Sequence, residues 1–475
     1  MTEGSVQMRL HLMTKRHFLL VLLTFFGSFI AVVIVGTVGP TILKSQADSH
    51  PLGAHNSSQL DEQFSDFYSV GPFILYPPSL SKFNQQLWLL SQITNQKHVQ
   101  GSSMKITMEV QVQLSTESSD KATPYGKQIN HNRIVECKEV CDDLVIMHLG
   151  FISEQSYRVE VTFARLANRE FFGNVTFKWT YYNAAFTQLE IWFRFGFLVL
   201  AFLATCLFVY SLKKFTFRNW SIEQKWMSIL LLFLCLYNNP LLPLSFLVSS
   251  WIPGMLDALF QATFLSGLLL FWLCAYHGIR QSERRFFKFY LPKLMIVFLI
   301  WLSAVTLASW QKYNELEDPG YNADLDTKNF MGFKVTFFVV IGLYVLYLLY
   351  LVVRAFVEMI NSSHFDIRFK FLSGLMFTVL AISIAITVLR FGNWSLQPTF
   401  ISGLTTQYNN SAEFLAFYGL LNFYMLTMAF VYSPTKYALI DSHFQDDPMT
   451  SMISGSDDET SLKAWHAARE SDSEG

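Results

Sequence analysis

The sequence contains few charged residues and no excess of charge of either sign. Asp, Glu, Lys and Arg make up 15% of its 475 residues, and the formal net charge is −1. Soluble domains contain about 25% charged residues, so this chain, 52% of whose residues are hydrophobic, would expose much apolar surface in water. The balanced charge also excludes the positive field with which proteins attract nucleic acid. The composition therefore predicts a membrane protein that contacts lipid and binds no nucleic acid.

Cysteine is scarce, and its placement is more informative than its number. Cys206, Cys235 and Cys274 lie in long apolar runs, where a small buried hydrophobic side chain is the expected role. Cys137 and Cys141 lie close together in a polar segment, and in an oxidising compartment such a pair predicts a disulfide. No further Cys or His ligands accompany this pair in a pattern typical of a metal site. We therefore predict neither a bound metal nor a cofactor.

The sequence also lacks the motifs of common catalytic sites. The polar region 40–187 contains no Gly-x-Ser-x-Gly, no His-Glu-x-x-His and no Gly-rich phosphate loop. The apolar runs contain no paired aspartates and no cluster of metal ligands. These absences favour a noncatalytic protein whose polar domain binds a partner.

Long apolar runs are abundant. A helix needs about 20 apolar residues to cross roughly 30 Å of hydrocarbon. Eight runs are long enough, and they cover residues 18–38, 191–212, 226–248, 256–278, 290–310, 331–353, 371–390 and 412–432. The predicted fold class is a multi-pass α-helical membrane protein, in which an N-terminal anchor helix precedes a seven-helix bundle over residues 188–432.

The first apolar run has two interpretations. Arg9, Lys15 and Arg16 precede it, as basic residues precede the core of a cleaved signal peptide. Its apolar part is much longer than the roughly 7–15 residues of a signal core, which favours a retained anchor helix over residues 18–39. Under either interpretation, the segment that follows lies in the lumen.

Basic residues are concentrated in alternate loops of the predicted bundle. Lys and Arg cluster in the loops 213–225, 280–288 and 354–370, and the intervening loops contain fewer of them. Short loops rich in Lys and Arg remain in the cytosol. We therefore expect the N-terminus (1–17) and the tail (433–475) to be cytoplasmic, and residues 40–187 to be lumenal or extracellular.

Glycosylation sequons agree with this orientation. The acceptor pattern Asn-x-Ser/Thr occurs in segments that are predicted to lie outside the cytosol, at Asn56, Asn174, Asn393 and Asn409. Two further sequons, at Asn219 and Asn361, lie in predicted cytosolic segments and should stay unmodified. A single sequon arises often by chance, so the distribution of basic residues is the stronger argument.

Residues 40–187 contain the pattern of half-buried β-strands. Apolar and polar residues alternate in 105–114, 157–163 and 174–181, which gives each strand one buried and one solvated face. Several such strands in a domain of this size favour a β-sandwich. The leading part, residues 45–66, is rich in Ser, Asn and Asp, and it is predicted to be a flexible stalk.

Polar residues within the apolar runs are candidates for function, because they are costly to place in lipid. Two groups stand out: a central one, Asn238, Asn239 and Asn422, and one toward the lumenal helix ends, Glu190, Arg194, Asp257, Gln261, Arg390 and Glu413. Pro240 follows the Asn pair and predicts a local break in the helix. The second group either rims a cavity that opens toward the lumenal domain or forms interfacial ion pairs, and the central group either binds a ligand or joins helices by hydrogen bonds.

The tail beyond residue 432 is acidic, with nine acidic and three basic residues. This composition predicts a disordered segment. Ser456 precedes an acidic run that suits an acid-directed kinase, and Tyr437-Ala-Leu-Ile440 fits a tyrosine sorting signal read by cytosolic adaptors. Chance explains that short pattern equally well.

Several long peptides resemble the transmembrane protein 181 family. They cover Leu189–Phe195, Ile222–Ser228, Tyr237–Pro240, Pro243–Val248, Trp251–Asp257, Phe271–Arg280 and Asn410–Leu415. That family is similar to Wntless and to other proteins that place a GOLD-like β-sandwich over seven helices. The resemblance implies a role in trafficking or as a receptor, in the Golgi, endosomes or plasma membrane. It also implies a link to the entry of bacterial genotoxins.

The sequence is compatible with three noncatalytic functions. The first is a receptor or cargo chaperone of the secretory pathway, with a lumenal protein client. The second is a G-protein-coupled receptor, although the segment Tyr276–Arg280 departs from Asp-Arg-Tyr and the last helix has no Asn-Pro-x-x-Tyr. The third is a channel or transporter, which needs a polar path that the few central polar residues do not supply.

Overall fold

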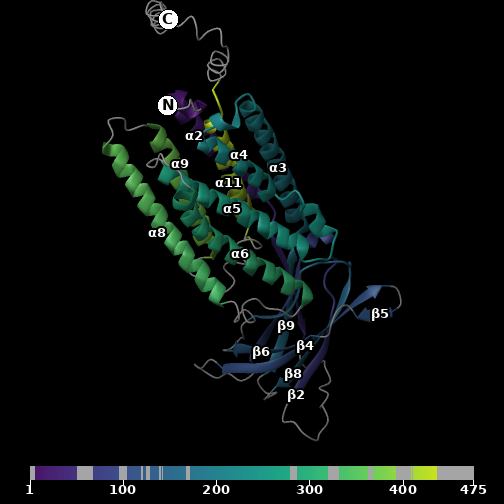
Figure 1. The fold of residues 1–475 in the computed structure, drawn as a ribbon. Coiled ribbons are helices and arrows are strands. Elements are labelled where there is room, and N and C mark those ends of the chain that lie inside the picture. The colour runs from purple at the N-terminus through teal and green to yellow at the C-terminus, as the bar shows by residue number, and fades with distance from the viewer. Residues whose placement is uncertain are drawn as a thin grey trace, which may run out of the picture.

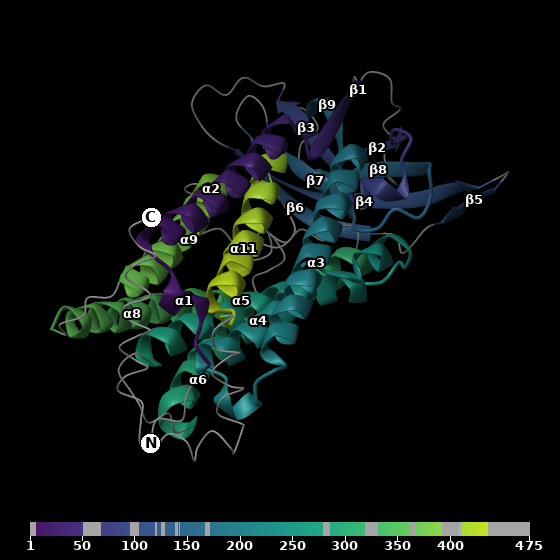
Figure 2. The ribbon, with the colours of Figure 1, turned by 90° about the horizontal axis from the view of Figure 1, so that it is seen from above.

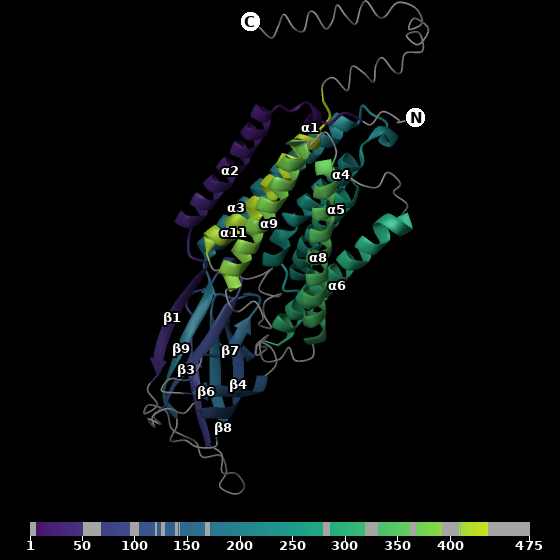
Figure 3. The same cartoon turned by 90° about the vertical axis from the view of Figure 1, so that its left-hand side faces the viewer.

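The chain folds into a β-sandwich and a bundle of helices that meet end to end (Figure 1). The computed structural model describes residues 6–50, 68–95, 104–118, 121–124, 129–137, 141, 143–166, 172–278, 286–318, 331–361, 367–391, 408 and 410–435. Helix α1 (Arg9–Leu12) lies at the end of the bundle that is farthest from the sandwich (Figure 3).

Two antiparallel sheets form the sandwich (Figure 3). The first contains, in order, β1 (Leu43–His50), β9 (Phe172–Tyr182), β3 (Leu87–Asn95) and β7 (Leu144–Leu149). The second contains β2 (Tyr68–Leu75), β8 (Tyr157–Leu166), β4 (Met104–Ser118) and β5 (Lys121–Pro124), with β6 (Ile129–Cys137) paired to β4. The predicted β-sandwich is confirmed.

The alternating residues form the core between the two sheets. Most apolar members of the alternating runs in β4, β8 and β9 are buried, Val161, Phe163 and Trp179 fully so, and Ile106 and Tyr181 are half-buried. Phe73 of β2 packs against Phe177 of the opposite sheet, with ring centroids 5.3 Å apart. Sequence periodicity therefore identified the faces that make contact.

The predicted stalk was wrong in its first residues. Strand β1 includes residues 45–50 and pairs with β9 from Leu43↔Tyr182 to His50↔Val175. The strand is polar because it lies at a sheet edge and its side chains are largely exposed from Leu43 to Ala47. Backbone hydrogen bonds to β9, which composition does not reveal, hold it in place. Residues 51–66 lie outside the described part of the chain.

Long helices form the rest of the described structure. They are α2 (Lys15–Val38), α3 (Ala184–Leu212), α4 (Ile222–Tyr237), α5 (Ile252–Gly278), α6 (Leu291–Glu317), α8 (Met331–Asn361), α9 (Ile367–Phe391) and α11 (Ser411–Tyr432). Seven segments among the described residues, all but α9, are long and apolar enough to cross a membrane, and α9 contains a shorter apolar stretch, Lys370–Ile386. Since α9 has 25 residues in all, it also reaches the length of a span. The anchor helix and the seven-helix bundle are confirmed.

Helix α4 ends where the Asn-Asn-Pro sequence predicts a break. It begins with a capping box between Ser221 and Gln224 and ends at Tyr237. Asn239 then adopts φ +50°, and its side chain accepts a hydrogen bond from the backbone N–H of Leu241 at 3.0 Å. A short 3₁₀ turn, η5 (Leu242–Phe246), follows. The break turns the chain at the end of the bundle that faces the sandwich.

Helix α2 packs along α11 (Figure 2). Near the sandwich, Gly36 lies so close to α11 that an added Cβ would be 2.5 Å from the Cα of Ala412. At the opposite end, the backbone N–H of Arg9 donates to the carbonyl of Ser433 at 2.9 Å. Residues that are far apart in the sequence thus join at both ends of this helix pair.

Candidate functional site

A polar cavity of about 150 Å³ lies between the sandwich and the helices. The sandwich contributes the turn that contains Gln85 and the loop 150–152 after β7. The helices contribute the start of α3, the turn after α4, the start of α5 and the end of α6. Both parts of the protein therefore build this site.

Arg194 of α3 is the central charge of the site, and its side chain is only 4% exposed. Its guanidinium lies 2.9 Å from the Glu190 carboxylate, one helical turn away, and 2.8 Å from the Asp257 carboxylate of α5. Two carboxylates around one buried arginine compensate its loss of hydration. The pairs fix α3 against α5 at the floor of the cavity.

Asp257 and Glu190 extend this network in opposite directions. The Asp257 carboxylate accepts hydrogen bonds from Asn239 at 2.7 Å and from Gln261 at 2.8 Å. The Glu190 carboxylate accepts one from the Gln85 side chain at 3.1 Å. Gln85 belongs to the sandwich, so a single hydrogen-bonded network joins the sandwich to the membrane helices.

Two tyrosines beside Arg194 carry buried hydroxyl groups that lack hydrogen-bond partners among the described residues. The ring of Tyr418 lies 4.8 Å from the guanidinium carbon of Arg194, and the ring of Tyr237 stacks on Tyr418 at 4.8 Å. A buried hydroxyl without a partner costs about 1–3 kcal/mol. Neither tyrosine is among the residues that line the cavity, so these hydroxyls are unsatisfied donors next to the site and not in its wall.

A second polar cluster adjoins the cavity at the end of α6. His148 of β7 is 6% exposed, stacks on Trp88 at 4.9 Å and contacts the Gln86 side chain at 3.3 Å. Burial lowers the pKa of His148, while nearby Glu315 opposes and Lys312 reinforces this decrease. Lys312 and Glu315 form an ion pair at 3.0 Å.

The charges that line the cavity are balanced. Three basic and three acidic side chains contribute to its wall, namely Lys82, Arg194, Lys312, Glu190, Asp257 and Glu315. No group of three or more His, Cys, Asp or Glu residues within the described residues is arranged to hold a metal ion. The volume of about 150 Å³ is below the roughly 300–1,000 Å³ of sites for whole small molecules, so this chemistry suits a single polar side chain with hydrogen-bond donors and acceptors.

The structure separates the polar residues of the apolar runs that the sequence marked as candidates for function. Asn239 and Asp257 line the cavity, and Gln261 supports Asp257. Asn238 and Asn422 lie outside the lining and exchange amide hydrogen bonds with each other, at 2.8 and 3.1 Å. Their pairing joins α4 to α11.

Two more predicted members of that group lie elsewhere. Glu413 is in the first turn of α11, where its backbone N–H donates to the side-chain oxygen of the N-cap residue Asn410 at 2.8 Å, and it is not among the lining residues. Arg390 belongs to α9, and its side chain lies outside the described part.

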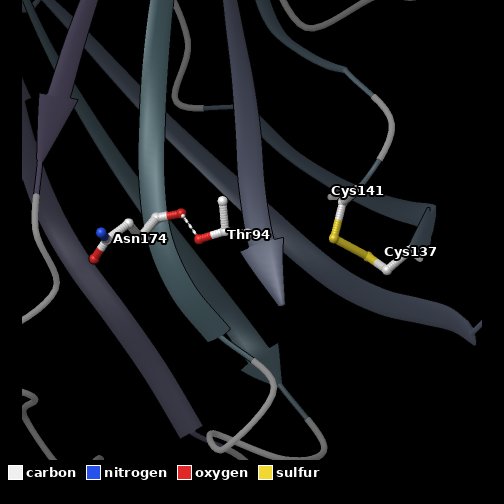
Figure 4. The surroundings of a disulfide bond; sticks show 4 residues. All are labelled: Thr94, Cys137, Cys141 and Asn174. Carbon is white, nitrogen blue, oxygen red and sulfur yellow. Dashed lines mark hydrogen bonds between the residues drawn. A yellow bond between two sulfur atoms is a disulfide. The ribbon is translucent and has the colours of Figure 1, made fainter. Parts of the chain in front are cut away.

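Two of the predicted modification sites, the cysteine pair and Asn174, lie in the described part of the sandwich. Cys137 and Cys141 form a disulfide at the end of β6 (Figure 4). Asn174 is exposed on β9, and its backbone carbonyl accepts a hydrogen bond from Thr94 at 3.0 Å (Figure 4). The other candidates, Asn56, Asn393, Asn409, Tyr437, Ile440 and Ser456, lie outside the described residues.

Sequence reasoning missed Gln85, Tyr237 and Tyr418. Gln85 has φ +49°, a conformation that is uncommon for residues other than glycine, but no local sequence motif predicts this conformation. The two tyrosines resemble any other aromatic residue in an apolar helix. Lys312 and Glu315 could have been identified from the sequence, because two opposite charges three residues apart at the end of a predicted span indicate an ion pair.

Comparison with known proteins agrees with this architecture. Residues 71–182 match the family model of the GOLD domain of TMEM181, and residues 183–436 match that of the Wntless-like transmembrane domain. Human transmembrane protein 181 is 48% identical over 460 residues, which cover 96% of this chain and 94% of the human protein. The chain belongs to the transmembrane protein 181 family. The family resemblance of the sequence is thereby confirmed, and so is a multi-pass membrane protein with a GOLD domain. In this family member, the cavity lies where the GOLD domain meets the Wntless-like helices.

Proposed function

We propose that this protein is a noncatalytic receptor or cargo chaperone of the secretory pathway, which holds a protein client between its GOLD domain and its helices. The client contributes a polar side chain to the cavity around Arg194 and Asp257. The cytoplasmic tail engages the sorting machinery, so that binding in the lumen is coupled to transport.

One observation carries this proposal: the polar cavity is built jointly by the sandwich and the bundle. Gln85 from the sandwich bonds to Glu190, which pairs with Arg194 in the membrane helices. A client bound here contacts both parts at once, and its release can follow from a small change in their packing.

Site-specific photocrosslinking in cells tests the proposal. A photoreactive amino acid at Phe246, which lines the cavity, should give a covalent adduct with a secreted or membrane protein. The same amino acid at Leu207, a 69% exposed position on α3 that does not line the cavity, serves as the matched control and should give none.

Substitution of the site residues makes the test specific. Asp257→Asn should reduce the yield of the adduct about tenfold, because a hydrogen bond to a charged group contributes roughly 1.5–3 kcal/mol. Asp48→Asn on β1 should leave it unchanged. Absence of any adduct from Phe246, with normal glycan maturation of the labelled protein, would contradict a client-binding role.

A further inference from the structure

A second, apolar groove lies at the end of the bundle that is farthest from the sandwich. It has a volume of about 810 Å³ and runs between α11 and the segment that contains α1 (Arg9–Leu12) and the start of α2. Its lining is mainly carbon and includes Met13, Leu20, Val21, Leu426 and Phe430. Its volume falls within the roughly 300–1,000 Å³ of sites that bind small molecules.

The groove lies within the thickness of one leaflet of a bilayer. Along α2 it extends from His17 to Thr24, a rise of about 10 Å at 1.5 Å per residue. Half of the roughly 30 Å hydrocarbon core is about 15 Å. The groove ends before α2 and α11 come into close contact at Gly36 and Ala412. The groove is therefore long enough for the part of a single acyl chain that lies nearest the headgroup.

The outer end of the groove is positively charged. The guanidinium carbon of Arg9 lies 4.9 Å from the centre of the Phe430 ring, and no carboxylate among the described residues pairs with it. His17 also lines the groove, while Lys15 and Arg16 precede it on α2. The lining contains no acidic residue. An anion placed at this end meets favourable charge and no acidic side chain among the lining residues.

We propose that this groove binds an anionic glycerophospholipid, with one acyl chain along Leu20 and Val21 and the headgroup phosphate at Arg9. This end of the bundle is the one predicted to face the cytosol, whose leaflet is rich in anionic lipids. The bound lipid fills the space between the anchor helix and α11, and so contributes to holding the anchor against the bundle.

Photolabelling of the full chain in lipid nanodiscs tests this site. A phosphatidylserine that carries a diazirine in its acyl chain should label residues around Leu20 and Leu426, as mapped by mass spectrometry of the peptides. A phosphatidylcholine with the same acyl chain should label them about fivefold less, the factor that corresponds to one basic residue near an anionic membrane surface. Equal labelling by the two lipids would overturn the proposal.

Two pairs of variants separate the contributions of shape and charge. Leu20→Trp fills the groove and should remove most of the labelling, whereas Leu19→Trp, at a residue of similar exposure (58% against 60%) outside the lining, should preserve it. Arg9→Gln should abolish the preference for phosphatidylserine, and Lys15→Gln should retain it. Thermal melting of each variant reports whether it remains folded.

The acidic tail is the competing occupant of the charged end, because it directly follows Thr435 in the sequence. Removal of residues 436–475 should leave the labelling unchanged if the lipid is the natural occupant. Labelling that appears only after this truncation would overturn the proposal, as would equal labelling of Leu20→Trp and Leu19→Trp.

Discussion

His148 places a titratable side chain at the contact between the sandwich and the helices. Burial lowers the pKa of His148 in the folded protein. In the unfolded chain this histidine becomes protonated below its ordinary pKa of about 6.5. The free energy of unfolding therefore falls as the pH decreases from about 6.5 toward the pKa of the folded state. We expect the melting temperature to be a few degrees lower at pH 5.5 than at pH 7.5, and His148→Gln to remove part of this difference.

Differential scanning fluorimetry of the detergent-solubilised protein at a series of pH values measures this effect. His17→Gln is the control, since His17 is exposed at the other end of the bundle and its removal should leave the pH dependence intact. A His148→Gln protein with the same pH dependence as the parent would show that the destabilisation arises elsewhere.

At this scale the sequence predicted the site only where polarity is unusual. Asp257 and Asn239 stand out because polar groups are costly in an apolar run, and both line the cavity. The same criterion selected Asn238 and Asn422, which pair with each other instead. Polarity alone cannot separate the two outcomes, because they depend on which residue lies opposite on another helix. The role of Gln85 could not be predicted for the same reason, since its hydrogen-bond partner Glu190 is 105 residues away in the sequence.

The contact of α2 with α11 determines whether the first helix is part of the folded bundle. An added methyl group at Gly36 would lie 2.5 Å from the Cα of Ala412, so the backbone of one helix must shift. We expect Gly36→Ala to reduce the free energy of unfolding by about 1–3 kcal/mol, the usual effect of overpacking. The fraction of protein that remains monodisperse after heating, measured by size-exclusion chromatography, reports this loss.

Gly27 provides the matched control on the same helix. Nothing lies within 4 Å of a Cβ built there, so Gly27→Ala should leave the stability unchanged or slightly higher. Equal stability of the two variants would mean that α2 does not pack on α11 as closely as the structure has it, and would favour a first helix that is removed as a signal peptide.

Elements with a strong internal pattern were predictable, and those held by a distant partner were not. The alternating strands and the apolar helices follow from periodicity and length. The break after Tyr237 follows from Pro240 and from the polarity of the two asparagines. Strand β1 could not be predicted, because its polar sequence shows no alternation of apolar and polar residues. It is held in place by pairing with β9, which lies more than 120 residues away along the chain.

For the whole molecule, orientation in the membrane decides which partners each end can meet. The loop 213–225 contains Lys213, Lys214, Arg218 and Lys225, and short loops with this content stay in the cytosol. This loop lies on the side of the N-terminal segment, since the backbone N–H of Val6 donates to the carbonyl of Asn219 at 3.0 Å. The sandwich lies at the opposite end of the helices (Figure 1). The cavity should therefore open on the lumenal side, and the lipid groove should lie in the cytoplasmic leaflet.

Epitope protection and glycan mapping test this orientation together. In sealed microsomes, an epitope at Asn56 should resist added protease, and an epitope between Lys213 and Lys214 should be cleaved. Asn174→Gln should remove one glycan, because Asn174 is exposed on the sandwich. Asn219→Gln is the matched control: it also removes a sequon, yet it should leave the mass unchanged, since glycans are added only in the lumen. Cleavage at Asn56 together with a glycan on Asn219 would show that the molecule has the opposite orientation in the membrane. The cavity would then face the cytosol, where no secreted client can reach it.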